Sequence, residues 1–302
     1  MKRKNKKKGI KAFLYALPGI IWVFVTCYCV LWGWIYAFYN YKPGRALSNC
    51  EFVGLKNFIT LFGNSVMRAN LFRSIKNTLG MHMLSYLFTP LPMLFAVFLS
   101  EVRSKKFQKF VQTVSTLPHF LSWVIIFSLC LGLFGNSGAV NQILHMLGSN
   151  AKVNILNSPN HVWMTQTLLS TWAGLGWSAI VYFAAIAGVD QEMYEAAVVD
   201  GAGKLQRIWY ITLPQLIPTY FVLLVMSIGK MLKSGIDQPL VFGNAMNMHA
   251  IETLDLYVYH LGIGNGLFSY SIAVGIMTSL VSLILFGLAN FASKKVRGVS
   301  VF

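Results

Sequence analysis

Long apolar segments alternate with short polar ones along the whole chain. A helix needs about 20 apolar residues to cross a bilayer, and six segments meet this requirement: residues 13–38, 77–100, 117–134, 163–187, 214–232 and 270–292. The pattern therefore predicts an all-α, polytopic membrane protein with six transmembrane helices. Its membrane domain would span residues 13–292, between a basic N-terminus (1–12) and a short tail (293–302).

Prolines should modify two of the predicted helices. Thr89, Pro90 and Pro92 lie inside the second, and we expect them to kink it because proline removes a backbone hydrogen bond and clashes with the preceding turn. Pro118 lies near the start of the third helix, where a proline is tolerated because the first N–H groups have no partner in the helix.

Lysine and arginine predict the orientation. Basic residues cluster at the N-terminus, between the second and third helices (Arg103 to Lys109), between the fourth and fifth (Lys204 and Arg207), and in the tail. A six-helix path places these four clusters on one side, which the positive-inside rule makes cytoplasmic. Residues 39–76, 135–161 and 233–269 would then lie outside, although the first of these segments also carries basic residues. We expect a multi-pass protein of a bacterial plasma membrane with both termini cytoplasmic.

Composition agrees with a membrane protein and excludes several other classes. Charged residues make up 11% of the chain, against about 25% in a soluble domain. The net charge is +16, but the basic residues are clustered, which argues against a nucleic-acid surface. The first apolar run exceeds the 7–15 residues of a signal peptide and has no small-residue cleavage site, so we expect it to be retained.

The sequence contains no recognisable catalytic or metal site. Cys27, Cys29, Cys50 and Cys130 lack metal-ligand spacing, and we expect them to pack among apolar side chains. The histidines are scattered, and no phosphate-binding glycine-rich motif occurs. The chain should therefore be non-catalytic and bind no cofactor of its own. None of its nine acidic residues lies inside a long apolar run, which argues against the alternative of an ion-coupled secondary transporter or a channel.

The polar segment 188–214 carries the most specific pattern. It predicts a short helix from Glu195 to Asp200, capped upstream by Asp190, and a stop at Gly201, where glycine permits a positive φ. An amphipathic stretch follows and leads into the fifth helix. Fixed spacing relates seven positions of this segment, in the order Glu-Ala-Ala, three residues, Gly, nine residues, and Ile-x-Leu-Pro.

This spacing resembles the EAA loop of ATP-binding-cassette (ABC) importer permeases. The segments FVGLKNF, EVRSKKFQKFVQT, LPHFLSW and WAGLGWSAIVYFAAIAGVD extend the resemblance over nearly the whole chain. It is closest to maltose-type carbohydrate permeases, in the subgroup for oligosaccharides derived from polysaccharides. Asp237 stands where relatives often have Glu, and Asn244 precedes Ala245 where proline is usual. These departures leave the identity of the sugar open.

The resemblance implies a type I importer permease fold and a set of partners. These are a second homologous permease subunit, two cytoplasmic ATPase subunits that carry ATP and Mg²⁺, a lipid-anchored extracytoplasmic binding protein, and an oligosaccharide substrate. A permease for a non-sugar solute is the alternative within this class. By resemblance, Glu195 pairs with a basic residue of the ATPase, and the coupling residues are Glu195, Ala196, Ala197, Asp200, Gly201, Ile211, Leu213 and Pro214.

Sugar sites combine aromatic faces with hydrogen-bonding side chains. The candidates for the substrate pathway are Asn77, His119, Trp123, Trp172, Trp177, Tyr182, Lys230, Lys233, Asp237 and Gln238. His119 and Trp123 are four residues apart, so we expect them to share a helix face. Trp172 and Trp177 would point in directions roughly 140° apart, so only one of them can face a narrow channel. Gly176 and its small neighbours predict close helix packing.

Lys230, Lys233 and Asp237 allow two interpretations. The lysines could extend to the outer interface, with Lys233 and Asp237 paired at helical spacing. Alternatively, they line the outer pathway and favour uronic acids. In the second case, Lys230→Ala should reduce uptake of a uronic oligosaccharide more than uptake of a matched neutral one. Equal loss of both would contradict an acid-specific role.

Overall fold

The protein is described by a computed structural model over residues 2–149 and 153–297, and this part of the chain is mainly helical. The α-helices are α1 (Lys2–Val23), α2 (Lys56–Gly63), α3 (Ser65–Tyr86), α4 (Leu91–Ser100), α5 (Lys105–Thr116), α6 (Trp123–Phe134), α7 (Ala139–Met146), α8 (Val162–Ala187), α9 (Gln191–Val199), α10 (Lys204–Arg207), α11 (Leu213–Gly229), α12 (Asp237–Phe242), α13 (Met248–Ile251), α14 (Leu254–Tyr259) and α15 (Phe268–Arg297). Between residues 2 and 297, outside the gap at 150–152, the one β-bridge joins Tyr39 and Phe52.

Six helical segments are long and apolar enough to cross a membrane, as the sequence predicts. They are Phe13–Phe38, Ser65–Ser100, Trp123–Met146, Pro159–Ala187, Lys204–Gly229 and Phe268–Lys295. Two segments begin earlier than expected, because polar residues extend the helix. The second begins at Ser65 and not at residue 77, and the fifth begins at Lys204 and not at residue 214. The fifth ends at Gly229, because Lys230 leaves helical geometry.

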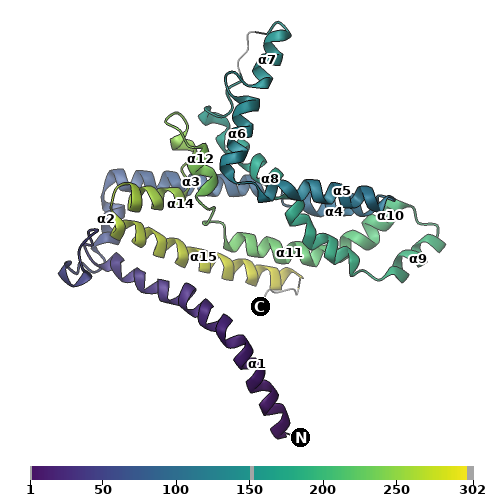
Figure 1. Cartoon of the computed structure of the whole chain (residues 1–302), viewed down its shortest axis with the longest axis horizontal. Coiled ribbons are helices and arrows are strands. Elements are labelled where there is room, and N and C mark those ends of the chain that lie inside the picture. Colours follow the sequence, from purple (N-terminus) through teal and green to yellow (C-terminus); the bar gives the residue numbers. More distant parts are fainter. Residues whose placement is uncertain (1, 150–152, 298–302) are drawn as a thin grey trace. The chain divides into compact units, whose positions relative to one another are not determined.

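The chain forms two compact units, and Figure 1 shows the elements of each. Unit one contains the chain up to Arg68 together with Val258–Ser279. Unit two contains Ala69–Tyr257 and the chain from Leu280 onward. Unit two contains the loop 188–214 and two cavities.

Proline interrupts the second span, and the third span begins at Trp123 and not at the expected Leu117. The second span breaks between α3 and α4 at residues 87–90, which confirms the expected kink. Pro118 lies in a 3₁₀ turn, Leu117–Phe120, and the chain then extends before Ser122 caps α6. The expectation that His119 and Trp123 share a helix face is therefore wrong, because the two residues belong to separate helical elements.

Helix α8 is the central element of unit two. Helices α4 and α5 pack along it, as Figure 1 shows. The closest approach is at Gly176, where a Cβ atom would collide with the backbone of Ser115. Ala179, one turn further on, is fully buried. This confirms the close packing predicted from the small residues.

Polar contacts fix the chain from α12 to α14 against α3. Arg73 and Glu252 form an ion pair at 2.9 Å. Asn77 donates from Nδ2 to the carbonyl oxygens of His249 (3.0 Å) and Glu252 (3.1 Å), and the Thr78 hydroxyl accepts from the Leu254 amide. Burial and the Glu252 carboxylate raise the pKa of the Tyr257 hydroxyl. Side chains of α3 therefore hold residues 249–254 against that helix.

Unit one is organised around the end of the first span. Asn57 on α2 is buried and donates to the carbonyl oxygens of Ala37 (2.8 Å) and Tyr39 (3.1 Å). Ser269 donates to the same Tyr39 carbonyl and accepts from the Tyr41 amide. The most apolar window of Phe13–Phe38 has no residue buried within the chain, so its side chains are available to lipid. Cys27 and Cys29 are among these exposed residues, whereas Cys130 is buried as expected.

Candidate functional site

The loop 188–214 begins with α9, which has defined ends. The Asp190 carboxylate accepts a hydrogen bond from the Glu192 amide at 3.0 Å and caps the helix. The helix ends at Gly201, which has a φ of +79°. The Gly201 amide donates to the Val198 carbonyl, and the Ala202 amide to the Ala197 carbonyl. The expected cap and positive-φ stop are both confirmed, although the helix starts earlier than Glu195.

The second half of the loop is continuous with the fifth span. The Gly203 amide donates to the Gln206 side chain at 2.7 Å, where α10 begins. A π-helical turn, Ile208–Thr212, then joins α10 to α11. Ile208 and Ile211 are buried, and Pro214 lies in the first turn of α11, directly after the π-helical turn.

Helix α9 carries apolar side chains that are exposed to solvent. None of its side chains is buried, and Val199 is 87% exposed. The helix lies outside the six apolar spans, and Figure 1 shows it beyond the ends of α4 and α5. A helix this short is marginal in water by itself. Its exposed apolar residues are typical of a surface that another protein covers.

One side-chain hydrogen bond ties α9 to the start of the fifth span. The hydroxyls of Tyr194 and Thr212 lie 2.9 Å apart, and Thr212 is buried. The sequence analysis did not identify either residue. Thr212 occupies the variable position of Ile-x-Leu-Pro, and Tyr194 directly precedes the fixed Glu195, so the spacing alone gave no signal for the pair.

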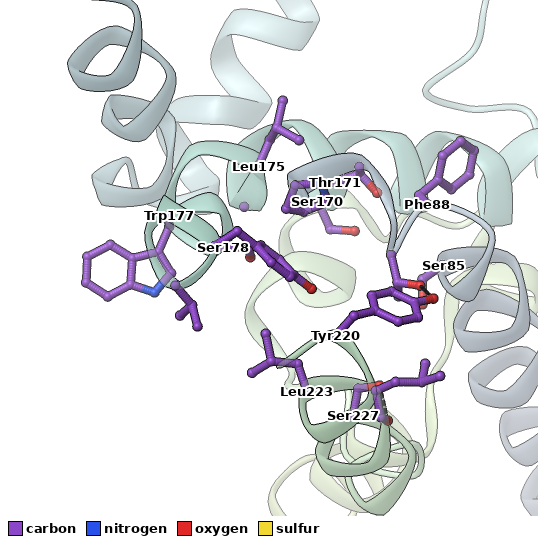
Figure 2. Close-up of a pocket in the computed structure, with 16 residues that line it drawn as sticks. Ser85, Phe88, Ser170, Thr171, Leu175, Trp177, Ser178, Tyr220, Leu223 and Ser227 are labelled. Carbon is purple, nitrogen blue, oxygen red and sulfur yellow. Dashed lines mark hydrogen bonds between the residues drawn. The ribbon is translucent and has the colours of Figure 1, made fainter. Parts of the chain in front are cut away.

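A cavity of about 420 Å³ lies between the second, fourth and fifth spans. The side chains around it are hydroxyl-bearing, aromatic or aliphatic, and none carries a formal charge. They come from Ser85, Phe88, Thr89, Pro92, Ser170, Thr171, Gly174, Leu175, Trp177, Ser178, Val181, Tyr182, Tyr220, Leu223, Leu224 and Ser227. Figure 2 shows Tyr220 reaching from α11 toward Ser85. Its hydroxyl lies 3.0 Å from that of Thr89.

Two of the predicted pathway residues line this cavity, Trp177 and Tyr182. Tyr182 is 3% exposed and packs in the core around α4 and α11. Trp177 lies at the edge of the cavity (Figure 2), stacked on His119 at a ring distance of 4.7 Å. Trp172 does not line the cavity, which agrees with its expected direction.

The remaining pathway candidates lie elsewhere. Trp123 packs on Phe242, and the Asn77 amide is used by the backbone contacts described above. Lys230, Lys233 and Asp237 are exposed. They line neither this cavity nor a smaller one next to it, which is described below. Lys233 and Asp237 form no ion pair within the described part of the chain, because the helix that would align them ends at Gly229. The acid-specific role of Lys230 and Lys233 stays a prediction.

The sequence analysis missed the hydroxyl residues of the cavity. Three of them lie on one side of α8: Ser170, Thr171 and Ser178. Gly174 lies between them on the same side. A stripe of hydroxyl groups on an otherwise apolar helix was the available signal.

A second cavity, of about 230 Å³, adjoins the first, since Ser85 and Ser170 line both. It is more polar and is lined by Met81, His82, Ser85, Gln166, Thr167, Ser170, Ser234, Gln238, Pro239 and Thr253. Gln238 is the predicted pathway residue in this group. Its side chain donates to the Gln166 carbonyl at 2.9 Å.

Residues 88–298, which include the loop 188–214 and most of both cavity linings, match the family model described as "Binding-protein-dependent transport system inner membrane component". The chain belongs to this family. The permease is 40% identical over 302 residues to the polygalacturonan/rhamnogalacturonan transport system permease protein YteP of Bacillus subtilis (strain 168), covering 97% of this chain and 92% of that protein. It is 36% identical over 285 residues to Protein LplB of the same organism, covering 94% and 88%.

Two solved structures also resemble the permease. One is a chain of a bacterial ABC transporter involved in the import of the acidic polysaccharide alginate, with a TM-score of 0.83, 33% identity and coverage of 97% and 98%. The other is a chain of a bacterial alginate ABC transporter in complex with alginate pentasaccharide-bound periplasmic protein, with a TM-score of 0.85, 33% identity and 99% of both chains covered. The expected ABC importer permease fold is confirmed.

Removing the Tyr194 hydroxyl should loosen α9. The hydrogen bond to Thr212 is worth about 0.5–1.5 kcal/mol, so Tyr194→Phe should raise amide hydrogen exchange in α9 by roughly 2- to 12-fold at constant global stability. Tyr210→Phe is the matched control, because Tyr210 is exposed and makes no hydrogen bond among the described residues. Unchanged exchange in Tyr194→Phe would show that the bond does not hold α9.

Proposed function

We propose that the permease carries oligosaccharides released from polysaccharides, including acidic ones, from an extracytoplasmic binding protein to the cytoplasm. The observation that carries this proposal is the neutral cavity of hydroxyl and aromatic side chains between the spans. Sugar rings offer C–H faces that pack on aromatic rings, and their hydroxyl edges exchange hydrogen bonds with serine, threonine and tyrosine. The polygalacturonan/rhamnogalacturonan and alginate systems named above support the same class of substrate.

The cavity argues against the other candidate functions. An ion-coupled transporter holds its coupling ion or proton with acidic residues inside the membrane, and no aspartate or glutamate lines either cavity. An amino acid or phosphate ion is charged over most of its surface and would need counter-charges to replace its hydration, whereas an oligosaccharide, neutral or acidic, presents mainly hydroxyl and C–H groups. His82 is the only ionisable nitrogen group in the two linings, so a hydroxyl-rich solute fits better.

The proposed importer contains more than this chain. Six spans supply half of a pathway, so a second homologous permease subunit completes it. ATP and Mg²⁺ bind to two cytoplasmic ATPase subunits, and a lipid-anchored binding protein delivers the sugar from outside. The basic clusters place both termini and the α9 loop on the cytoplasmic side of a bacterial plasma membrane. The permease has the role of a non-catalytic subunit.

The coupling loop connects the ATPase to the cavity through helical structure. Helix α9 docks on the ATPase through its exposed apolar surface, and Glu195 pairs with an arginine or lysine there. Displacement of α9 passes to Thr212 through the Tyr194 hydroxyl. From there, α11 continues to Tyr220 and Ser227 in the cavity lining. Closure of the ATPase can therefore change the shape of the cavity directly.

Changes in α9 should affect coupling and leave membrane insertion intact. Glu195→Lys removes a charge-assisted bond worth about 1.5–3 kcal/mol, so attachment of the ATPase should weaken by at least 10-fold. Gly201→Val forces a β-branched residue into a positive-φ position and should tilt α9. Both variants should lower uptake per ATP hydrolysed in reconstituted vesicles.

Matched controls exist for both variants. Glu192→Lys alters a charge in the first turn, and Gly203→Ala alters a glycine with an ordinary φ of −70°. Each control should keep most of the coupling. Normal uptake and ATP hydrolysis in both Glu195→Lys and Gly201→Val would exclude this loop as the coupling element.

A further inference from the structure

The second cavity holds two polar atoms that the protein leaves without a partner. Gln166 is only 7% exposed, and its Oε1 atom is buried with no hydrogen bond to any described residue. The Nε2 atom of His82 is also buried and has no hydrogen bond to a described residue. Buried polar atoms without partners are costly and rare in native proteins. Both residues line the same cavity, so one ligand in this cavity could bind to both atoms.

Ser85, Ser170 and Gln238, which line the same cavity, already donate to backbone carbonyls. The Ser85 hydroxyl donates to the His82 carbonyl at 2.8 Å, and the Ser170 hydroxyl donates to the Thr167 carbonyl at 3.0 Å. The Gln238 amide donates to the Gln166 carbonyl and therefore not to the Gln166 side chain. The Gln166 oxygen accepts no hydrogen bond from a described residue, so it is available to a donor that enters the cavity.

The chemistry of the lining narrows the class of ligand. Without a carboxylate or a thiol, the cavity offers a poor metal site. An amide oxygen accepts hydrogen bonds, and a neutral imidazole nitrogen can donate or accept, so a group with both capacities fits. A sugar hydroxyl has both. The cavity also continues into the aromatic one at Ser85 and Ser170, where the proposed function places a sugar.

We propose that the second cavity is a separate sugar subsite, which binds a hydroxyl-bearing ring adjacent to the ring in the aromatic cavity. This inference rests on the proposed oligosaccharide transport. A ring hydroxyl donates to Oε1 of Gln166, and Nε2 of His82 bonds to a hydroxyl of the same ring. The two subsites make this half of the pathway selective for at least two linked rings.

The variant Gln166→Met distinguishes a ligand-binding role of the Gln166 side chain from a structural role. Methionine keeps the size of the side chain and removes the unpartnered oxygen. The unfolding midpoint should therefore stay equal or rise, while uptake of digalacturonate and trigalacturonate should fall by about 5- to 10-fold, the loss expected for one hydrogen bond to substrate. Uptake is measured in vesicles that contain the complete importer with its binding protein. His82→Leu should reduce uptake in the same way.

Gln108→Met is the matched control. Gln108 lies outside both cavities and donates to the Leu99 carbonyl at 3.2 Å, so this variant should lower the unfolding midpoint and keep the uptake rate per assembled complex. Wild-type uptake in both Gln166→Met and His82→Leu would overturn the subsite and show that the cavity holds water only. Parallel loss of midpoint and uptake in both variants would overturn it in favour of a packing role. If the assembled wild-type importer moves no oligosaccharide, the proposed function itself fails.

Discussion

The close contact of α8 with α4 and α5 is the packing on which the rest of unit two depends. Helices in a bilayer gain little from the hydrophobic effect, so they associate through small residues and hydrogen bonds. Gly176 allows the backbone of Ser115 to approach, and Ala179 continues the same contact. This contact fixes the rotation of α8, and the rotation determines that Ser170 and Ser178 line the cavity rather than face lipid.

The same helix bundle joins the two functional regions. Ile208, in the coupling loop, is part of a buried cluster with Tyr182 of α8 and Leu216 of α11. The loop is therefore packed against the helices that surround the cavity, while α9 itself is held by the Tyr194–Thr212 bond and exposes its apolar residues. A rigid base with an exposed docking helix suits a part that receives movement from another subunit and transmits it.

The sequence predicted the six spans, the kink of the second one, and the Asp190 cap and Gly201 stop of α9, because each depends on local chemistry: apolar length, proline, a capping carboxylate and a glycine with positive φ. It failed where the outcome depends on tertiary contacts. The break before Trp123 separates it from His119, and the Asn77 amide binds backbone carbonyls of a distant segment. The hydroxyl groups of α8 were overlooked because serine and threonine also occur in membrane helices without a ligand.

If α9 is the surface on which the ATPase docks, a crosslinker at its most exposed apolar residue should reach the ATPase. A photoreactive amino acid at Val199, which is 87% exposed, should crosslink to the ATPase subunit in the assembled importer, with a yield that changes when ATP is bound. The same group at Met146, an exposed position at the end of α7 on the predicted outer side, should give no such product. Crosslinking of the ATPase from Met146 and not from Val199 would show that the ATPase does not dock on α9.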